Sequence, residues 1–239
     1  MRIPKITGII KRRFLINFRI EPEVMSRVLP KPFCPKLHNG YAVGGICLIR
    51  LEGIKPAVFP LPWGFSSENA AHRVAVTWEG NEGVYIPRRD SDSRVSQLAG
   101  GRIFPGVHYP ATFDVRDSEG YFDFKMKSKD SHTTVSFSGR VSDTFPESSC
   151  FSSLQESSDF FESGSLGYSA KKSGSKYDGL RLETESWTVS PFEIENLESS
   201  FFNDARNFPE GSIEYDHTLF MQNIKHHWHH EDDLCCQTR

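Results

Sequence analysis

Two short stretches bring together side chains that could bind or transform a small molecule. The first, SSENAAHR, places Glu68 and His72 at the start of an apolar run, and the second, EGVYIPRRD, ends a strand-like run in Pro-Arg-Arg. A carboxylate or an imidazole can move a proton in acid–base catalysis, and an arginine binds a carboxylate through two parallel hydrogen bonds. The pattern therefore predicts a site for a small acidic molecule.

The adjacent residues Arg88 and Arg89 are expected to point in opposite directions. Successive side chains of a strand alternate between its two faces, so one arginine should face the interior of a curved sheet. Arg88 shares its face with Val84 and Ile86, whose apolar side chains suit an interior wall. We therefore predict that Arg88 binds an organic acid inside the fold, close to the carboxylate and the imidazole described above.

The predicted site has a catalytic part and a binding part. The candidate catalytic residues are Glu68 and His72. The candidate substrate-binding residues are Arg88, Arg89, Ser67 and Asn69. A purely structural role stays open, in which Arg88, Arg89 and Arg94 pair with Asp90, Asp92 and Glu68 to hold a helix against the sheet. Buried ion pairs cost desolvation as well as gaining attraction, so such pairing would not exclude a site.

Composition and charge narrow the classes of protein. The chain has 239 residues, a formal net charge of -3 at pH 7 and no basic stripe, so nucleic acid is not an expected partner. Its five cysteines are odd in number and have no CxxC spacing, which favours free thiols in a reducing compartment. Cations interrupt the N-terminal apolar segment, so neither a signal peptide nor a membrane span is expected. We expect a cytoplasmic protein.

Alternation of apolar and polar residues predicts strands along the whole chain. The runs GVHYPATFDV and YFDFKMK alternate clearly, and the turn RDSEG between them suits an antiparallel hairpin. Further strands are expected at 14–20, 42–53, 72–79, 82–88, 133–141, 180–189 and 213–222, and short helices at 21–29, 91–99 and 152–163. The expected fold is mainly β, a closed or highly curved antiparallel β-barrel with a few short peripheral helices.

One domain is expected over 1–239. The serine-rich segment 148–175 could be a linker, but its helix has the capping-box spacing and carries phenylalanines, so we expect it to pack. The end of the chain, from about 226 to 239, is expected to be a poorly packed tail. Its HHWHH sequence lacks the spacing and the additional ligands of a tetrahedral metal site, so no metal is expected, and no cofactor is expected elsewhere.

A family resemblance runs through most of the chain. The motifs RRFLINFRIEPEVMSRVLPKPF, GYAVGGICLIRL, SSENAAHR, EGVYIPRRD, LAGGRIFPG, SSFFND and EYDHTLFMQNIKHHWH, in this order, resemble the DUF2071 or YqjF-like family. That family is remotely similar in fold to acetoacetate decarboxylase, a closed antiparallel β-barrel with a ligand cavity. The resemblance implies the same fold here, and, since the decarboxylases form rings of subunits, it also implies a homo-oligomer.

The resemblance also implies a specific loss of chemistry. In the decarboxylase, a lysine of a Pro-Lys-Lys segment forms a Schiff base with the substrate, near an upstream glutamate. By resemblance, Pro87-Arg88-Arg89 stands in the Pro-Lys-Lys place and Glu68 stands for the glutamate. A guanidinium keeps its proton and does not condense with a ketone. We therefore expect Schiff-base decarboxylation to be absent.

Three functions remain open. The first is a fold that binds a small acidic or apolar molecule, such as a carboxylate, without transforming it. The second is a lyase, hydratase or isomerase in which Arg88 anchors a carboxylate while Glu68 or His72 moves a proton. The third is an assembly protein whose interior is filled by its own phenylalanines. A cavity lined by Glu68 and an arginine would exclude the third.

Overall fold

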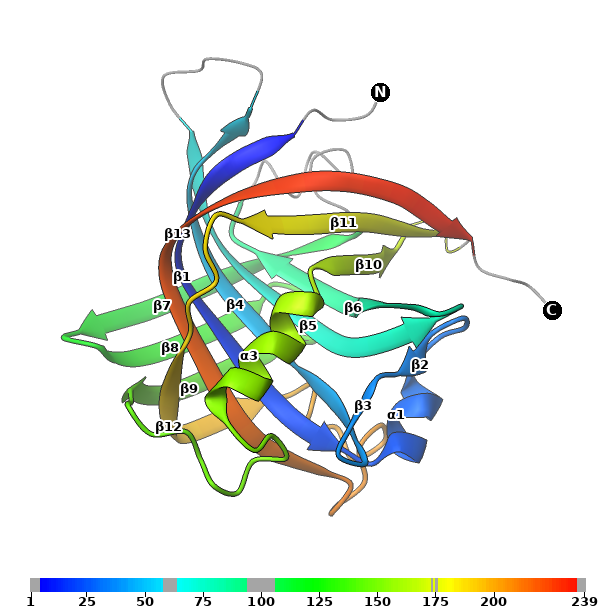
Figure 1. Ribbon diagram of the computed structural model, residues 1–239. Coiled ribbons are helices and arrows are strands. Elements are labelled where there is room, and N and C mark those ends of the chain that lie inside the picture. Colours follow the sequence, from blue (N-terminus) through cyan, green and yellow to red (C-terminus); the bar gives the residue numbers. More distant parts are fainter. Residues whose placement is uncertain (1–4, 58–63, 94–105, 173, 175, 236–239) are drawn as a thin grey trace.

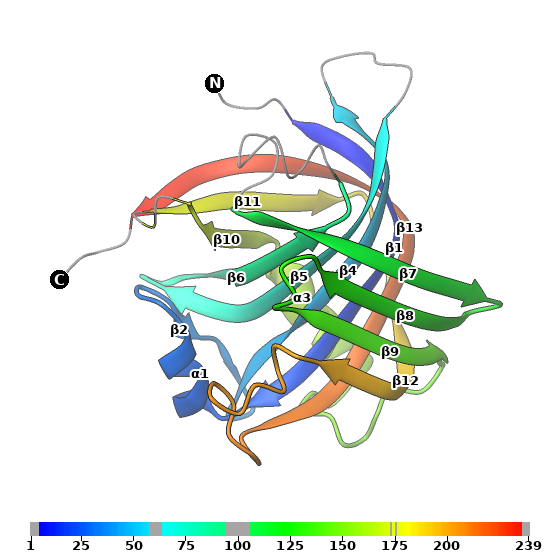
Figure 2. The same ribbon diagram turned by 180° about the vertical axis from the view of Figure 1, so that it is seen from behind.

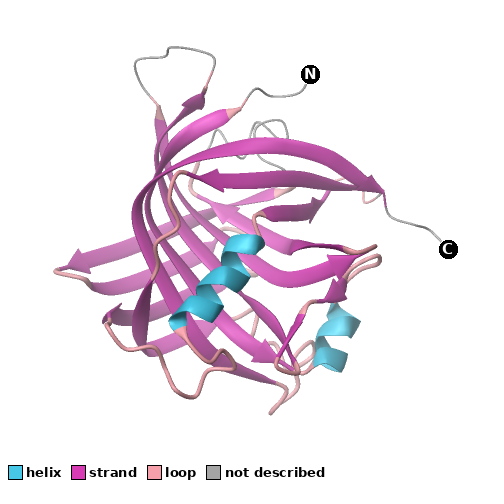
Figure 3. Ribbon diagram, viewed as in Figure 1, coloured by secondary structure: helices cyan, strands magenta, loops and turns pink. Residues whose placement is uncertain are grey.

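The structure is a computed structural model that describes residues 5–57, 64–93, 106–172, 174 and 176–235. It consists mainly of strands, with two helices among these residues (Figures 1 and 3). The helices are α1 (Pro22–Val28) and α3 (Leu154–Ser163). The strands are β1 (Ile6–Ile20), β2 (Cys34–Pro35), β3 (Leu37–His38), β4 (Tyr41–Pro56), β5 (Phe65–Trp78), β6 (Asn81–Ser91), β7 (His108–Ser118), β8 (Tyr121–Ser128), β9 (Thr134–Val141), β10 (Leu166–Ala170), β11 (Lys176–Thr184), β12 (Ser190–Ser199) and β13 (Ile213–Cys235).

All thirteen strands belong to one highly curved sheet, whose pairings close two circuits. The first circuit runs β6-β7-β8-β9-β12-β13-β1-β4-β5 and returns to β6. The second runs β11-β10-β6-β5-β4-β1-β13 and returns to β11. The two circuits share β1, β4, β5, β6 and β13, so each shared strand presents one face to each circuit.

Phenylalanine rings fill the first circuit. Phe14 of β1 contacts Phe122 of β8 and Phe137 of β9 with ring centroids 5.1 and 5.0 Å apart, although β1 is not hydrogen-bonded to either strand. These contacts therefore cross the interior. Figure 2 shows β7, β8, β9 and β12 side by side on this part of the molecule. Aromatic edge contacts of this kind contribute beyond the apolar area that they bury.

Helix α3 packs on the side of the second circuit (Figure 1). Ser153 caps its start by accepting a hydrogen bond from the backbone N–H of Glu156 at 3.1 Å, and Gly164 follows its last turn. These are the expected cap and stop of the predicted helix. The side chain of Phe161, from this helix, is buried in a second apolar cluster that also contains Leu15 and Trp228.

A β-bulge changes the direction of side chains within β6. The pairing of β6 with β5 advances from Val74↔Tyr85 to His72↔Arg88, which is two residues on β5 and three on β6. One extra residue in a strand reverses which face the following side chains occupy. Val84 and Ile86 therefore share a face with Arg89 rather than with Arg88.

The sequence-based prediction of the fold needs three corrections. The strand expected at 213–222 continues to Cys235, and His226 and Trp228 are buried within it, so 226–235 is not a poorly packed tail. Strands β2, β3, β10 and β12 were not predicted, and the strand expected at 180–189 is β11, which spans Lys176–Thr184. The pairings of β6 with β7 and with β10 are parallel. The helix predicted at 91–99 lies largely outside the described residues.

The predicted strands and the curved, mainly β fold are otherwise confirmed, including the hairpin of β7 and β8 with Ser118 opposite Tyr121. None of the described helices has the length and apolar character that a membrane crossing requires.

Candidate functional site

The second circuit lines a cavity of about 310 Å³ that is partly open to the outside. Its walls come from β1, β4, β5, β6, β10, β11 and β13, and the end of α3 borders it. Pockets for small molecules in proteins have volumes of about 300–1,000 Å³. The cavity is therefore large enough for a small organic molecule.

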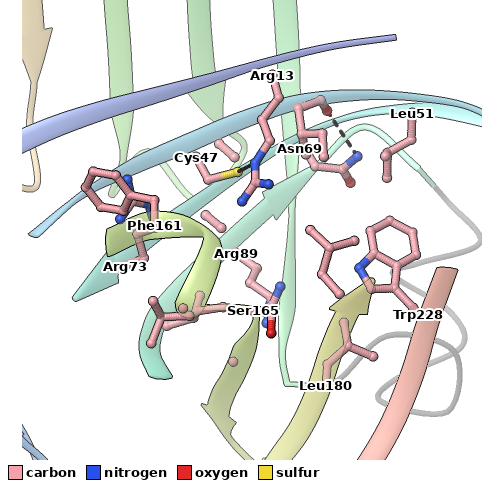
Figure 4. Close-up of a pocket in the computed structure, with 18 of the residues that line it drawn as sticks. Arg13, Cys47, Leu51, Asn69, Arg73, Arg89, Phe161, Ser165, Leu180 and Trp228 are labelled. Carbon is pink, nitrogen blue, oxygen red and sulfur yellow. Dashed lines mark hydrogen bonds between the residues drawn. The ribbon is translucent and has the colours of Figure 1, made fainter. Parts of the chain in front are cut away.

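Three arginines from three strands line this cavity: Arg13 of β1, Arg73 of β5 and Arg89 of β6 (Figure 4). The Nε of Arg13 donates a hydrogen bond to the Sγ of Cys47 at 3.2 Å, and the Nε of Arg89 donates to the Oγ of Ser169 at 3.0 Å. Convergent guanidinium groups in a concave site favour an anionic ligand.

Arg73 is the most deeply buried of the three, with 4% of its surface exposed. Its Nη2 donates to the Oδ1 of Asn17, and its guanidinium lies 4.6 Å from the ring centroid of Phe161. Its Nε and Nη1 are buried and have no hydrogen-bond partner among the described residues. Burial lowers the pKa of Arg73 to about 10, so it remains a cation at neutral pH. A buried cation with two unused donors is costly.

The opposite wall of the cavity is apolar. Figure 4 shows Leu51, Leu180 and Trp228 together on one side, with Arg73 and Phe161 on the other. Leu180 and Leu182 of β11 are only partly buried although they face this interior wall. The cavity thus offers cationic groups at one side and apolar surface at the other, which suits an organic acid with an apolar body.

Arg88 does not line the cavity, and its predicted orientation is corrected. Its guanidinium forms ion pairs with Asp90 at 2.8 Å and with Asp130 at 2.9 Å, and lies 3.9 Å from the ring centroid of Tyr109. The bulge in β6 is the physical reason, because it places Arg89 on the cavity side instead. The pairing of Arg88 with Asp90 agrees with the structural role that the sequence left open.

Glu68 and His72 also lie away from the cavity lining. Glu68 forms an ion pair with Arg12 at 2.7 Å, and burial raises its pKa, partly offset by that arginine. The ring of His72 is fully buried against Phe201, with centroids 4.6 Å apart, and neither ring nitrogen has a hydrogen-bond partner among the described residues. Burial and the charge of Arg88 lower the pKa of His72 to about 3, so the imidazole is neutral at pH 7.

Of the remaining predicted binding residues, Asn69 lines the cavity, whereas Ser67 does not line it but forms a hydrogen bond with the side chain of Asn69. The Nδ2 of Asn69 donates to the Oγ of Ser67 at 2.9 Å, while its Oδ1 accepts from the Oγ of Ser91 at 2.7 Å. These two bonds fix the orientation of the amide. The structure therefore brings Asn69 and Arg89 together at the cavity, with Ser67 behind them, and places the other three predicted residues elsewhere.

A network of buried polar side chains extends from Arg73 to Asp216 and His217, near the start of β13. Asn17 accepts from Arg73 through Oδ1, and its Nδ2 lies 3.0 Å from the Nε2 of His217. The Nδ1 of His217 lies 2.5 Å from the Oδ2 of Asp216, and the Oγ of Ser157 lies 2.7 Å from its Nε2. Since the carboxylate can only accept, Nδ1 carries the proton and Nε2 is the acceptor.

Ser157, His217 and Asp216 are hydrogen-bonded in the same sequence as the serine, histidine and aspartate of a hydrolase triad. Unlike the residues of an active triad, they are not accessible to a substrate. Ser157 and His217 are fully buried, and neither lines the cavity. A nucleophilic serine must reach a substrate carbonyl, so we assign this network a structural role. It holds Asn17, and through Asn17 the guanidinium of Arg73.

Sequence reasoning missed Arg13, Arg73 and Cys47 as cavity residues. Arg73 stands in the same SSENAAHR motif and shares the alternation of Asn69, which was a usable signal. Arg13 and Cys47 come from separate strands, and no local spacing links them. Among the described residues, no group of three or more histidine, cysteine, aspartate or glutamate side chains could hold a metal ion.

Comparison with solved structures identifies the class of fold. Acetoacetate decarboxylase from Legionella pneumophila subsp. pneumophila str. Philadelphia 1 is similar over 97% of this chain and 88% of its own, with 15% identity and a TM-score of 0.60. An acetoacetate decarboxylase-like enzyme from Sphingomonas wittichii RW1 is similar over 98% and 93%, with 12% identity and a TM-score of 0.60. The enduracididine biosynthesis enzyme MppR, in its complex with pyruvate, is similar over 99% and 92%, with 11% identity and a TM-score of 0.53. The chain has an acetoacetate decarboxylase-like fold.

Within this class, the family is also defined. The model of DUF2071, described as an uncharacterized conserved protein, matches residues 10–224. The chain therefore belongs to the DUF2071 family. A comparison with curated proteins gives no match.

Proposed function

We propose that this protein binds a small organic acid in the cavity of the second circuit, through Arg13, Arg73 and Arg89. The observation that carries the proposal is the approach of three arginines to one cavity, of which Arg73 is the most deeply buried. The complex of the similarly folded MppR with pyruvate supports a carboxylate as the ligand class. The apolar wall opposite the arginines favours an acid that also carries an apolar body.

Binding is expected to depend on Arg89. Carboxylic acids of two to six carbons should raise the melting temperature of the protein, whereas their uncharged amides should not. Arg89→Met should weaken binding about 10- to 100-fold, since a hydrogen bond to a charged group contributes about 1.5–3 kcal/mol. Isothermal titration calorimetry on both proteins measures this.

The neighbouring Arg12 provides the control for that experiment. Arg12 precedes Arg13 on β1 but pairs with Glu68 away from the cavity, so Arg12→Met should leave the dissociation constant of the acid within about twofold. Arg88→Met is not a suitable control, because it would leave the carboxylate of Asp90, which lines the cavity, without its ion-pair partner. Equal binding by the wild type and Arg89→Met would refute the proposed site.

We propose further that binding involves no Schiff base. None of the described residues that line the cavity is a lysine, and the sequence has no lysine outside the described ranges. Incubation with a 2-oxo or 3-oxo acid and borohydride should therefore leave the protein mass unchanged, because a guanidinium forms no imine that could be reduced. A stable adduct on any lysine, detected by peptide mass spectrometry, would contradict this.

Proton transfer by Glu68 or His72 is not part of the proposal. Both side chains lie outside the cavity lining, and a catalytic base must reach its substrate directly or through one water.

A further inference from the structure

A cysteine lies beside the arginines of the cavity. Cys47 of β4 lines it, is not in a disulfide, and has 8% of its surface exposed. Its Sγ accepts the hydrogen bond from the Nε of Arg13 at 3.2 Å. Arg73 and Arg89 line the same cavity. Figure 4 shows the sulfur beside Arg13 and facing the cavity.

This surrounding differs from that of an inert buried thiol. A guanidinium N–H donated to sulfur stabilises negative charge on that sulfur, and reactive cysteines occupy electropositive, accessible pockets. Arg73, whose Nε and Nη1 are buried without a hydrogen-bond partner among the described residues, is a further cation in the wall of the same cavity. An acid held by the arginines would bring the carbon next to its carboxylate close to Cys47.

We infer that Cys47 is a nucleophile of this site and that it adds reversibly to organic acids with an electrophilic carbon beside the carboxylate, in particular 2-oxo acids. This inference rests on the proposed function, since the arginines select the acid. The thiol would attack the carbonyl carbon of the acid, as the lysine amine does in a Schiff-base enzyme.

The addition balances without a further reactant. The sulfur attacks the carbonyl carbon, a C–S bond forms, and the electron pair of the C=O π bond moves to the oxygen. The proton lost by the thiol ends on that oxygen, which gives a thiohemiketal. Nothing is oxidised or reduced, and the reverse reaction restores the thiol and the 2-oxo acid. The guanidinium of Arg73 or Arg89 can stabilise the developing oxyanion.

Alkylation with a charged and an uncharged reagent tests the inference. Iodoacetate carries the carboxylate that the arginines select, and iodoacetamide is its neutral counterpart. Each reacts with a thiolate by forming a C–S bond and releasing iodide. We expect the ratio of the iodoacetate rate to the iodoacetamide rate at Cys47 to exceed the ratio at the exposed Cys34 by at least tenfold. Peptide mass spectrometry of the same samples measures both residues at once.

Protection and substitution sharpen this test. Propionate, which has no electrophilic carbon, should protect Cys47 from iodoacetate and leave Cys34 unprotected. Arg73→Met should reduce the ratio at Cys47 to that at Cys34, and Cys34→Ser should leave the labelling of Cys47 unchanged. With ¹³C-labelled pyruvate, a new resonance of a tetrahedral carbon should appear in the wild type and be lost in Cys47→Ser.

The failure of this inference is distinguishable from the failure of the proposed function. If propionate raises the melting temperature but Cys47 reacts no faster with iodoacetate than Cys34 does, the arginine site stands and the nucleophile is refuted. If no carboxylate binds and Cys47 shows no preference for the charged reagent, both are refuted.

Discussion

Replacement of Asp216 by alanine is expected to reduce the free energy of unfolding by about 3–5 kcal/mol, the cost of removing one partner from a buried charged network. The carboxylate accepts hydrogen bonds from Ser149 Oγ at 2.6 Å and from the backbone N–H of Cys150 at 2.8 Å, in addition to His217. Burial alone would raise the pKa of Asp216, but these hydrogen bonds outweigh it and hold the pKa well below its usual range. Urea unfolding at pH 7 measures the effect.

Glu214 provides the matched control for this variant. Both Asp216 and Glu214 pair with Arg19, but the side chain of Glu214 is 58% exposed and that of Asp216 is 2% exposed. An exposed ion pair contributes about 0–1 kcal/mol, so Glu214→Ala should change stability little. If the two variants unfolded at the same urea concentration, the buried network would have no special part in stability.

The orientation of Arg88 and Arg89 could be predicted only in part from the sequence. Alternation predicted that one of Arg88 and Arg89 would face inward, and it correctly grouped Val84 with Ile86. The bulge that follows Tyr85 could not be predicted, because it appears only as an unequal step in the pairing with β5. One inserted residue reversed the assignment of every later side chain in the strand.

The cavity required pairing information that the sequence does not carry. Arg13, Cys47 and Arg73 come from three strands, and their approach follows from the order β1-β4-β5 within the sheet. The family resemblance implied a ligand cavity, but strand alternation alone could not tell which of two circuits would be filled. Phenylalanines occupy the first circuit, so the space for a ligand lies in the second.

The C-terminal strand was underestimated because its composition is polar. In HHWHH, His226 and Trp228 face inward with ring centroids 4.3 Å apart, while His229 faces outward and lies 2.7 Å from Glu183. This alternation is the normal strand pattern, with histidine in apolar positions. By contrast, the hairpin of β7 and β8 and the cap of α3 were predictable, since local turn and capping residues determine both.

Three buried histidines should make the protein lose stability as the pH falls below about 6.5. Burial lowers the pKa of His72 to about 3 and that of His226 to about 4, and it also lowers the pKa of His217 against the opposing effect of Asp216. The unfolded chain therefore binds protons between pH 6.5 and these lower values while the folded chain does not. The contribution of the neutral, buried histidines to the free energy of unfolding is fully present above pH 6.5 and is lost as the pH falls. Between pH 6.5 and 4.5, His72 and His226 should each account for roughly 2 kcal/mol.

A single substitution can isolate the contribution of His72. Its ring lies among phenylalanines without a hydrogen-bond partner among the described residues, so His72→Leu keeps the apolar packing and removes the titration. The free energy of unfolding can be measured by urea titration from pH 7 to 4.5. Its slope against pH near pH 5 should be smaller in the variant than in the wild type, by about 1.4 kcal/mol per pH unit. The exposed His132 is the control, since His132→Leu should leave the slope unchanged. Burial raises the pKa of Glu68 and Asp90, which opposes the loss at the acidic end, but both variants retain these groups. A slope that His72→Leu leaves unaltered would mean that this imidazole is protonated in the folded protein.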